Sequence, residues 1–547
     1  MRGRLASGLR LLSSEPLASH HGIRGTFDLV VIGGGSGGLA AAREAAALGG
    51  RVALLDAVVP SPRGTTWGLG GTCVNVGCIP KKLMHQAAHF GDVLGADAAA
   101  FGWQLQAAGT PQHSWERLRE AVAQYVASSN YGYRAALRKE GIVLLETFGR
   151  LAGQRADGKH VVRASGSSSE LVTSSVLIAT GTRPFIPDIP GAAGLGVTSD
   201  DLFSLPHAPG RVLVVGGGYI ALECAGFLCG LGSPVTVANR TDTFLRGFDR
   251  DLADAAVRDL ARRGVRLVTG ASVARLDKAA ASPTAVLAVV SEGGTGTPSL
   301  LGEFDTVLFA TGRSATSSQS WLEDGAPALD SSDGRVVGGF SWSGRAAMPE
   351  ASSAEGVFAV GDILHANPEL TPVAIHQGVR VARTLAAEQS WSHRAGGNRP
   401  PAAASVTSAP FLGGASLLGM SLDGITSRVS TASSSDQGAD PGVPTRQSSR
   451  RPWQLAVPRP ITRESVATAV FTPCELATVG LSEAEAKTKH GDDGVEVIWS
   501  RYDTLERSMT LQASWTPEGA EVRACQHARL LRLGAWRMPT VDPPRSG

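Results

Sequence analysis

The sequence predicts an α/β protein with two nucleotide-binding units. Two observations predict this fold class: an apolar strand, a glycine-rich turn and a helix follow one another from residue 27 to 48, and the same succession returns from residue 211 to 229. A chain of 547 residues has room for two or three domains. A third observation, the close pair Cys73 and Cys78 between the two units, indicates a chemical function.

The first unit begins with the apolar run 27–32, and five glycines follow within residues 33–38. Gly33 allows a tight turn, Gly35 lets a pyrophosphate approach the backbone, and Gly38 permits close packing of the helix on the strand. The diphosphate then lies at the N-terminus of the helix, where free N–H groups attract anions.

The next apolar strand, 51–56, ends in Asp56, 18 residues after Gly38. A carboxylate at this place accepts hydrogen bonds from a ribose 2′-hydroxyl group. Strand, glycines, helix, strand and acid in this order are more specific than a glycine motif alone. We therefore expect this unit to bind a dinucleotide.

The second unit repeats the pattern with the strand 211–215, three glycines at 216–218 and the strand 234–238. No acid ends its second strand; Arg240 and Arg246 follow instead. Guanidinium groups at this place suit the 2′-phosphate of NADP better than a free ribose hydroxyl. The alternative is a surface loop whose arginines are only solvated.

Cys73 and Cys78 enclose a very small ring. Because the stabilisation by a disulfide grows with the loop that it closes, this pair is a poor staple and fits a disulfide that opens and closes during turnover. Two nucleotide sites around a dithiol indicate electron transfer from nicotinamide to flavin to disulfide. The alternatives are a zinc ligand pair or buried core cysteines. The other four cysteines offer no second close pair with histidine, and we expect Cys224 and Cys229 to lie in a helix core.

Charge and composition restrict the partners. Lys and Arg number 51 against 49 Asp and Glu, a net charge of +2, which gives no case for nucleic acid or a membrane surface. No apolar run of about 18 residues occurs, so no transmembrane helix is predicted. Residues 1–25 are rich in Arg, Ser and Leu with a single acid, the composition of a mitochondrial transit peptide; a disordered basic start is the alternative.

Three segments resemble the pyridine nucleotide disulfide oxidoreductase family, and within it the mitochondrial high-molecular-weight thioredoxin reductases. They are GGTCVNVGCIPKKLMHQA at 70–87, SNYGYR at 129–134 and LECAGFL at 222–228. The resemblance implies two Rossmann-like domains plus a partial α+β dimer-interface domain. It divides the chain into a transit-like segment 1–25, an FAD-binding domain 26–191 and 314–387, an NADPH-binding domain 192–313, and an interface remnant 464–497.

The resemblance also implies roles for single residues. Cys78 would face the flavin, Cys73 would exchange with the next disulfide, Lys81 would pair with Glu223, and Tyr219 would gate the nicotinamide pocket. A thiolate at a helix N-terminus beside a lysine is also stabilised on physical grounds. The residues expected to bind FAD or NADPH are Gly33, Gly35, Ser36, Gly38, Asp56, Gly71, Thr72, Thr180, Gly181, Gly216, Gly218, Tyr219, Ala221, Arg240, Arg246, Gly312, Arg313, Gly361, Asp362, Thr371 and Ala374.

The resemblance breaks off after residue 387 and resumes only in the interface remnant 464–497. Residues 388–463 are dominated by Ser, Ala, Gly, Pro and Arg and predict a disordered insertion; residues 498–547 form an atypical tail. The sequence contains no His-Pro dipeptide, the family's acid and base for the exchanging thiol, and no terminal Cys-selenocysteine pair.

The expected function is that of an NADPH-dependent, FAD-containing thioredoxin-disulfide reductase. For the chain as written, the missing His-Pro dipeptide and the atypical tail predict slow transfer and little thioredoxin reduction, and the partial interface domain predicts an impaired homodimer. The alternatives are a glutathione reductase and a truncated or misspliced flavin-binding isoform without full turnover. The mitochondrial matrix is the expected location, with the cytoplasm as the alternative.

Overall fold

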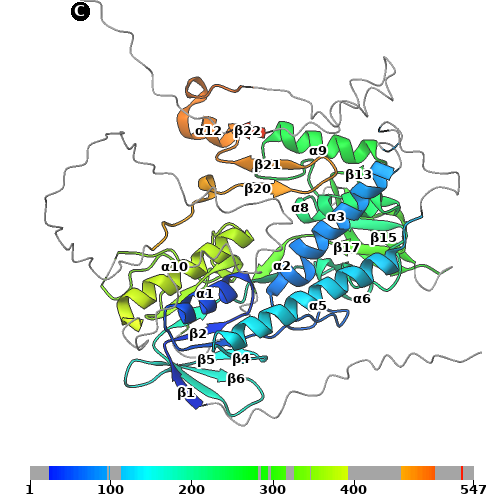
Figure 1. The fold of residues 1–547 in the computed structure, drawn as a ribbon. Coiled ribbons are helices and arrows are strands. Elements are labelled where there is room, and N and C mark those ends of the chain that lie inside the picture. The colour runs from blue at the N-terminus through cyan, green and yellow to red at the C-terminus, as the bar shows by residue number, and fades with distance from the viewer. Residues whose placement is uncertain are drawn as a thin grey trace, which may run out of the picture.

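A computed structural model describes residues 24–94, 98, 101, 112–280, 285–292, 297–315, 326–344, 346–391, 457–498 and 531–533. Residues 1–23 of the transit-like segment, most of the predicted insertion and most of the tail lie outside these residues. No helix within the described part is long and apolar enough to cross a membrane. Figure 1 shows two α/β units, with α1 and α10 side by side in one and α8 and α9 in the other.

The first unit is built on a parallel five-stranded sheet with the order β19-β8-β2-β3-β4. Its strands are buried apolar runs, as expected for a sheet covered on both faces. They are β2 Leu29–Ile32, β3 Val52–Leu55, β4 Val143–Leu145, β8 Val176–Ile178 and β19 Val357–Ala359. The helix α1 (Ser36–Ala47) follows β2, which confirms the predicted strand, glycine turn and helix.

Helix α10 (Thr371–Gln389) lies directly against α1. The two backbones come very close, since a Cβ atom at Gly378 would lie 2.3 Å from the carbonyl oxygen of Gly37. The 3₁₀ turn η3 (Gly361–Ile363) precedes α10 and follows β19. The ends of β2 and β19 and the starts of α1 and α10 therefore meet at one place.

The predicted strand 27–32 is divided in the structure. Asp28 interrupts it, because its Oδ2 atom accepts a hydrogen bond from the backbone N–H of Arg51 at 2.8 Å. The residues before it form β1 (Arg24–Phe27), which joins a different sheet with the order β1-β7-β6-β5. The other strands of that sheet are β5 Gly149–Gln154, β6 His160–Ala164 and β7 Glu170–Thr173.

The second unit has a parallel five-stranded sheet with the order β10-β17-β11-β12-β13. Its strands are β10 Val197–Thr198, β11 Val212–Val215, β12 Val235–Ala238, β13 Arg266–Val268 and β17 Thr306–Phe309. The helix α8 (Tyr219–Gly230) follows β11, and α9 (Arg250–Arg262) joins β12 to β13. The second predicted repeat of the strand, turn and helix is therefore confirmed.

The strands β14 Ala271–Lys278, β15 Val286–Glu292 and β16 Ser299–Phe304 form an antiparallel sheet beside this unit. The short helices α6 (Ala192–Leu195) and α7 (Ser199–Leu202) lie on either side of β10, where the chain enters the second parallel sheet. A two-stranded ribbon of β9 (Thr182–Pro184) and β18 (Arg313–Ala315) brings together the chain segments that pass between the units. The domain boundaries predicted from the sequence stay predictions.

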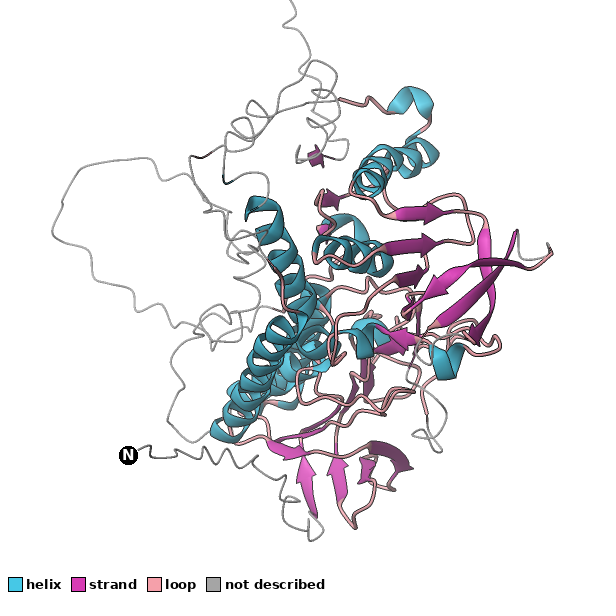
Figure 2. Ribbon diagram, turned by 90° about the vertical axis from the view of Figure 1, so that its right-hand side faces the viewer, coloured by secondary structure: helices cyan, strands magenta, loops and turns pink. Residues whose placement is uncertain are grey.

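Two long helices from the first half of the chain are α3 (Cys78–Asp92) and α5 (Trp115–Lys139), and the six-residue α2 (Gly71–Val76) directly precedes α3. Helix α5 reaches both units, since Trp115 belongs to the core of the second unit and Leu137 to that of the first. Figure 2, turned from the first view, shows these long helices on one side of the molecule and the sheets on the other. Buried residues of α3, among them Met84 and Ala88, share one hydrophobic core with Phe227 and Leu228 of α8.

Residues 457–498 pack on the second unit. They contain η8 (Arg463–Ser465), β20 (Thr468–Val470), β21 (Leu476–Val479), α12 (Glu483–His490) and η9 (Asp492–Gly494). Val470 and Leu476 belong to the same core as the second parallel sheet. β20 and β21 form a separate sheet, and a third strand, β22 (Leu531–Leu533), pairs parallel with β21. A piece of the tail that resembles nothing in the family therefore adds to this small sheet.

The folded core extends beyond the predicted boundary at residue 387. Helix α10 runs to Gln389, and Trp391 is fully buried, with its indole N–H donating to Oε1 of Gln389 at 3.0 Å. The ring lies where a side chain on Gly50 would be, since a Cβ there would come within 2.7 Å of it. The Ser- and Gly-rich composition after residue 387 concealed this single large apolar anchor.

Candidate active site

A cavity of about 460 Å³ opens where the two units meet. It is lined by the glycine turn after β2, by the starts of α2, α3, α8 and α10, and by the segment after β8. It brings together most of the residues predicted from the sequence: Gly33, Gly35, Ser36, Asp56, Gly71, Thr72, Cys73, Cys78, Lys81, Thr180, Gly181, Tyr219, Glu223, Arg313, Gly361, Asp362, Thr371 and Ala374.

The helices that begin at this cavity carry no side-chain caps. Helix α1 starts after Gly35, α3 after Gly77 and α10 after Leu370, and in none of them does a side chain accept from the first backbone N–H groups. Such free N–H groups, at the positive end of the helix dipole, are a binding site for anions. This donor set fits the diphosphate of a dinucleotide.

Two glycine turns touch at the floor of the cavity. Gly71 has φ +67°, and a Cβ atom on it would lie 2.6 Å from Cα of Gly35. A ligand at the N-terminus of α1 therefore meets bare backbone on both sides. Gly38 lines no part of the cavity; a Cβ there would lie 1.9 Å from the oxygen of Gly33, which confirms its predicted role in close packing.

Asp56 lies at the end of β3 as predicted. Its Oδ1 atom accepts a hydrogen bond from the backbone N–H of Gly34 at 2.7 Å. Burial raises the pKa of this carboxyl group to about 6, although the hydrogen bond from Gly34 acts in the opposite direction. Asp56 also lines the cavity, and a ribose hydroxyl is the donor that suits a carboxylate at this place.

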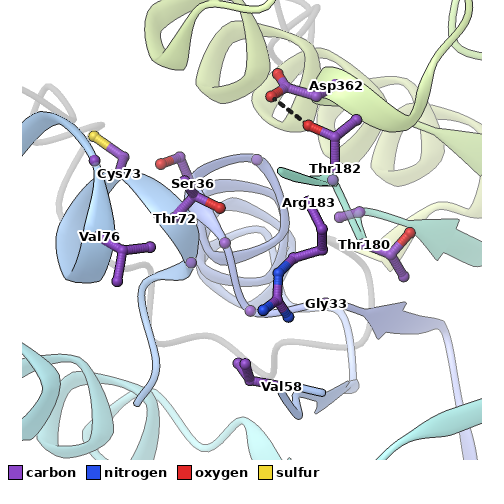
Figure 3. A pocket seen from close by; sticks show the side chains of 18 of the residues that line it. Gly33, Ser36, Val58, Thr72, Cys73, Val76, Thr180, Thr182, Arg183 and Asp362 are labelled. Carbon is purple, nitrogen blue, oxygen red and sulfur yellow. Dashed lines mark hydrogen bonds between the residues drawn. The ribbon is translucent and has the colours of Figure 1, made fainter. Parts of the chain in front are cut away.

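Asp362 and Thr182 also line the cavity. The hydroxyl of Thr182 donates to Oδ2 of Asp362 at 3.4 Å, and Nε of Arg313 donates to the same hydroxyl at 2.9 Å. Burial, aided by the charge of Glu369, raises the pKa of Asp362. Figure 3 shows Thr180, Thr182 and Asp362 on one side of the pocket and Cys73 with Thr72 on the other.

The two cysteines lie in consecutive helices. Cys73 lies in α2 and Cys78 is the first residue of α3, with Gly77 between the helices. Both side chains are half-buried and reduced. The Sγ atom of Cys78 lies 3.8 Å from the hydroxyl oxygen of Thr371, at the start of α10. Cys78 therefore lies between the N-termini of two helices.

The pKa values of the two thiols are shifted in opposite directions. The hydrogen bond between the two sulfur atoms lowers the pKa of Cys78 to about 7, and the charge of Lys81 and the hydroxyl of Thr371 help, against the effect of burial. The same hydrogen bond, together with burial, raises the pKa of Cys73 well above its ordinary value. Cys78 is therefore the thiolate and Cys73 the thiol that donates to it.

Lys81, one turn after Cys78, pairs with Glu223 of α8. Its Nζ atom lies 2.9 Å from Oε1 of Glu223, a side chain only 2% exposed, which confirms the predicted pair. Glu223 is the fifth residue of α8 and not a first-turn acid. Burial alone lowers the pKa of Lys81, but Glu223 and the two cysteines outweigh it and the net shift is upward.

The second glycine turn forms a separate surface outside this cavity. Gly216 has φ +135°, and a Cβ on it would lie 2.3 Å from the oxygen of Ala310. Asn239 is buried, and its Nδ2 atom donates to the backbone oxygens of Thr241 and Thr243. Arg240 and Arg246 are exposed in the loop after β12. Gly218, Ala221 and Gly312 also lie outside the cavity lining, whereas Tyr219 and Ile220, directly after the glycines, belong to it.

Sequence reasoning missed several residues of the site. Arg183 places its guanidinium 4.4 Å above the ring of Trp67 and pairs with Asp200 at 2.9 Å. Arg183 follows Thr180-Gly181 by two residues, so that motif was a signal for it. Phe471 and Glu475, described below, had no signal of their own. Of the other cysteines, Cys224 is buried as predicted, and Cys229 is half-buried with its thiol 3.3 Å from the oxygen of Arg263.

The fold and the site together define a protein that binds two dinucleotides around a dithiol. Residues 27–378 match the family described as pyridine nucleotide-disulphide oxidoreductase, and the chain belongs to that family. Membership implies FAD and NADPH as its cofactors. The uncapped helix starts, the contact of Gly35 with Gly71 and the carboxylates Asp56 and Asp362 fit FAD in the cavity.

A similar curated protein is the thioredoxin reductase SEP1 of Emiliania huxleyi. It is 37% identical over 491 residues, which cover 88% of this chain and 81% of the relative.

Proposed function

We propose that the chain is an NADPH-dependent thioredoxin-disulfide reductase that works through Cys73 and Cys78. The observation that carries the proposal is the placement of Cys78 at the start of α3, beside the Lys81–Glu223 pair and inside the cavity that fits FAD. The relative named a thioredoxin reductase supports the choice of substrate. No observation favours oxidised glutathione.

Each cysteine has a distinct part in the proposed reaction. Bound FAD would accept electrons from NADPH and pass them to the disulfide. Opening the disulfide consumes two electrons and leaves the thiolate on Cys78, where Lys81 and the start of α3 stabilise it, and the proton on Cys73. Cys73 then gives up its proton and attacks one sulfur of the thioredoxin disulfide, and the departing thioredoxin thiolate takes up that proton. The Cys78 thiolate next attacks Cys73 in the mixed disulfide, which restores the Cys73–Cys78 bond and releases the second thioredoxin sulfur as a thiolate that solvent protonates.

The cofactor contacts are part of the same proposal. Asp56 would accept from the ribose of FAD, the starts of α1 and α2 would hold the diphosphate, and Asp362 would lie toward the ribityl chain. Thr371 and Ala374 would line the flavin ring. At the second site the NADPH diphosphate would lie against Gly216, Gly218 and Ala221, and its 2′-phosphate against Arg240 and Arg246. Gly312 and Arg313 would close the NADPH-binding segment of the chain. Tyr219 would cover the nicotinamide pocket.

The sequence has no His-Pro dipeptide to supply an acid and base, so we expect slow exchange with thioredoxin. We also propose a homodimer and, from the composition of residues 1–25, the mitochondrial matrix. A fluorescent fusion of residues 1–25 checks the location: it should enter mitochondria, and a cytoplasmic signal would contradict the proposal.

The decisive experiment uses the purified FAD-loaded protein. Anaerobic NADPH should raise the number of free thiols by two in the wild type and leave the Cys78→Ser variant unchanged. Thioredoxin disulfide added next should oxidise those thiols again, and oxidised glutathione should not. A wild type whose thiol count does not respond to NADPH would be a flavin-binding protein without disulfide reduction. Thiols that oxidised glutathione re-oxidises and thioredoxin disulfide does not would make the protein a glutathione reductase.

A further inference from the structure

The loop 471–475 joins β20 to β21 and lies over the helices that carry Lys81 and Glu223. Its Pro473 packs on α8 where Gly226 leaves room, because a Cβ there would come within 2.6 Å of the proline ring. Thr472 and Cys474 are buried, and the hydroxyl of Thr472 donates to the oxygen of Cys474 at 2.6 Å. The loop is therefore held firmly against the second unit.

Phe471 is the residue of this loop that reaches the redox site. Its ring centroid lies 4.6 Å from Nζ of Lys81 and 4.1 Å from Nζ of Lys82. These distances are those of cation–π contacts. Its backbone N–H donates to Oε1 of Glu223 at 2.8 Å, the same oxygen that pairs with Lys81. Phe471 therefore contacts both members of the Lys81–Glu223 pair.

Glu475, at the other end of the loop, keeps Lys82 beneath the ring. Its Oε1 atom lies 2.9 Å from Nζ of Lys82 and 3.0 Å from Nε2 of His85. The imidazole of His85 meets the Phe471 ring edge to face, with centroids 6.1 Å apart. Lys82 thus has Glu475 as its own carboxylate, and Glu223 remains available to Lys81.

We propose that Phe471 is a positioning residue for the Cys78 thiolate. The ring covers one side of the Lys81 ammonium and excludes water from it, so the positive charge acts on Cys78 through a medium of lower dielectric constant. The backbone N–H fixes the Glu223 carboxylate, and with it the direction of the ammonium. The inference rests on the proposed role of Cys78 as the thiolate that faces the flavin.

The groups that face Cys78 and Lys81 come from several elements, so the readout must report on Cys78 itself. They are Cys73 of α2, Lys82 and His85 of α3, Glu223 of α8, Thr371 of α10 and Glu475 of the loop. The rate at which iodoacetamide alkylates Cys78, measured against pH and assigned by peptide mass spectrometry, follows the thiolate directly.

The test compares Phe471→Leu, which keeps apolar bulk but has no π face, with Phe471→Tyr, which keeps the ring. In the reduced FAD-loaded protein, the leucine variant should show a higher pH midpoint and about threefold slower alkylation of Cys78 at neutral pH. The tyrosine variant should match the wild type. Phe471→Met, flexible enough to fill the same space, replaces leucine if that variant does not fold.

A wild-type midpoint in the leucine and methionine variants would overturn the inference, and so would equal shifts in leucine and tyrosine, which would mean packing alone. The thioredoxin assay separates this result from the proposed function. If the pH midpoint of Cys78 alkylation shifts in a protein that does not reduce thioredoxin, the positioning role of Phe471 holds and thioredoxin is not the substrate.

Discussion

The Nζ atom of Lys81 lies 2.9 Å from Oε1 of Glu223, and the two side chains are 16% and 2% exposed. This pair joins α3 to α8 directly behind the dithiol. A buried carboxylate that loses its cation costs about 3 to 5 kcal/mol, far more than a surface pair contributes. The pair therefore stabilises the fold as well as the Cys78 thiolate.

Lys81→Met should reduce the free energy of unfolding by about 3 kcal/mol, because Glu223 stays buried without a cation. Lys82→Met is the matched control: its partner Glu475 is 35% exposed and keeps His85, so the loss should be about 1 kcal/mol or less. Urea denaturation followed by circular dichroism measures both. Equal losses would mean that the Glu223 carboxylate is not stranded by the substitution.

The hydrogen bond between the thiols predicts different pKa values of Cys78 for two substitutions of Cys73. Cys73→Ala removes the donor, so the pKa of Cys78 should rise from about 7 toward its ordinary value. Because only the thiolate reacts, alkylation at neutral pH should slow. Cys73→Ser keeps a hydroxyl donor and should retain most of the low pKa. The pH profile of Cys78 alkylation in the reduced protein checks this, and identical profiles for Ser and Ala would contradict it.

Asp56 predicts a pH dependence of FAD binding. The carboxyl group of the flavin-free protein has a pKa of about 6, and only its ionised form offers charge-assisted acceptors to a ribose. Affinity should therefore fall as the pH drops through about 6. Asp56→Asn should bind FAD about tenfold more weakly at neutral pH, and its affinity should not vary in this range. Fluorescence titration of the flavin-free protein measures both, and tight, pH-dependent binding by the asparagine variant would refute the role.

The contact of α10 with α1 predicts opposite effects for two glycine substitutions. Gly378→Ala places a methyl group 2.3 Å from the oxygen of Gly37, and such overpacking costs about 1 to 3 kcal/mol. It should also weaken FAD binding, because it displaces the start of α1. Gly132→Ala, in α5 with no atom within 4 Å of the new methyl group, should stabilise by about 0.5 to 1 kcal/mol. Thermal denaturation with and without FAD tests both signs.

Arg240 and Arg246 predict the choice between NADPH and NADH. Both are exposed after β12, where a 2′-phosphate would lie. Each change to Ala should raise KM for NADPH about tenfold, the value of a charge-assisted hydrogen bond, and leave KM for NADH unchanged. Arg266, exposed in the neighbouring strand β13, is the control whose change to Ala should affect neither. Equal changes in KM for both nucleotides would mean that these arginines do not bind the 2′-phosphate.

The local parts of this protein follow from local sequence. The two strand, glycine and helix units, the position of Asp56, the dithiol at helix ends and the burial of Cys224 each depend on residues within one short stretch. Backbone geometry and hydrophobic burial of that stretch decide them. The family motifs, through resemblance, added the Lys81–Glu223 pair, whose members are 142 positions apart.

Other features were decided only when distant segments packed together. Asp28 separates β1 from β2, where Arg51 offers it a backbone N–H, and Trp391 is buried because Gly50 leaves space for its ring. Lys82 meets Glu475 across 393 positions because the β20–β21 loop docks on α3 and α8. No local pattern encodes such contacts, since they depend on which helix faces become neighbours. The sequence by itself determined the chemistry of the dithiol and its cofactors, and the tertiary structure decided which residues surround the Lys81 ammonium.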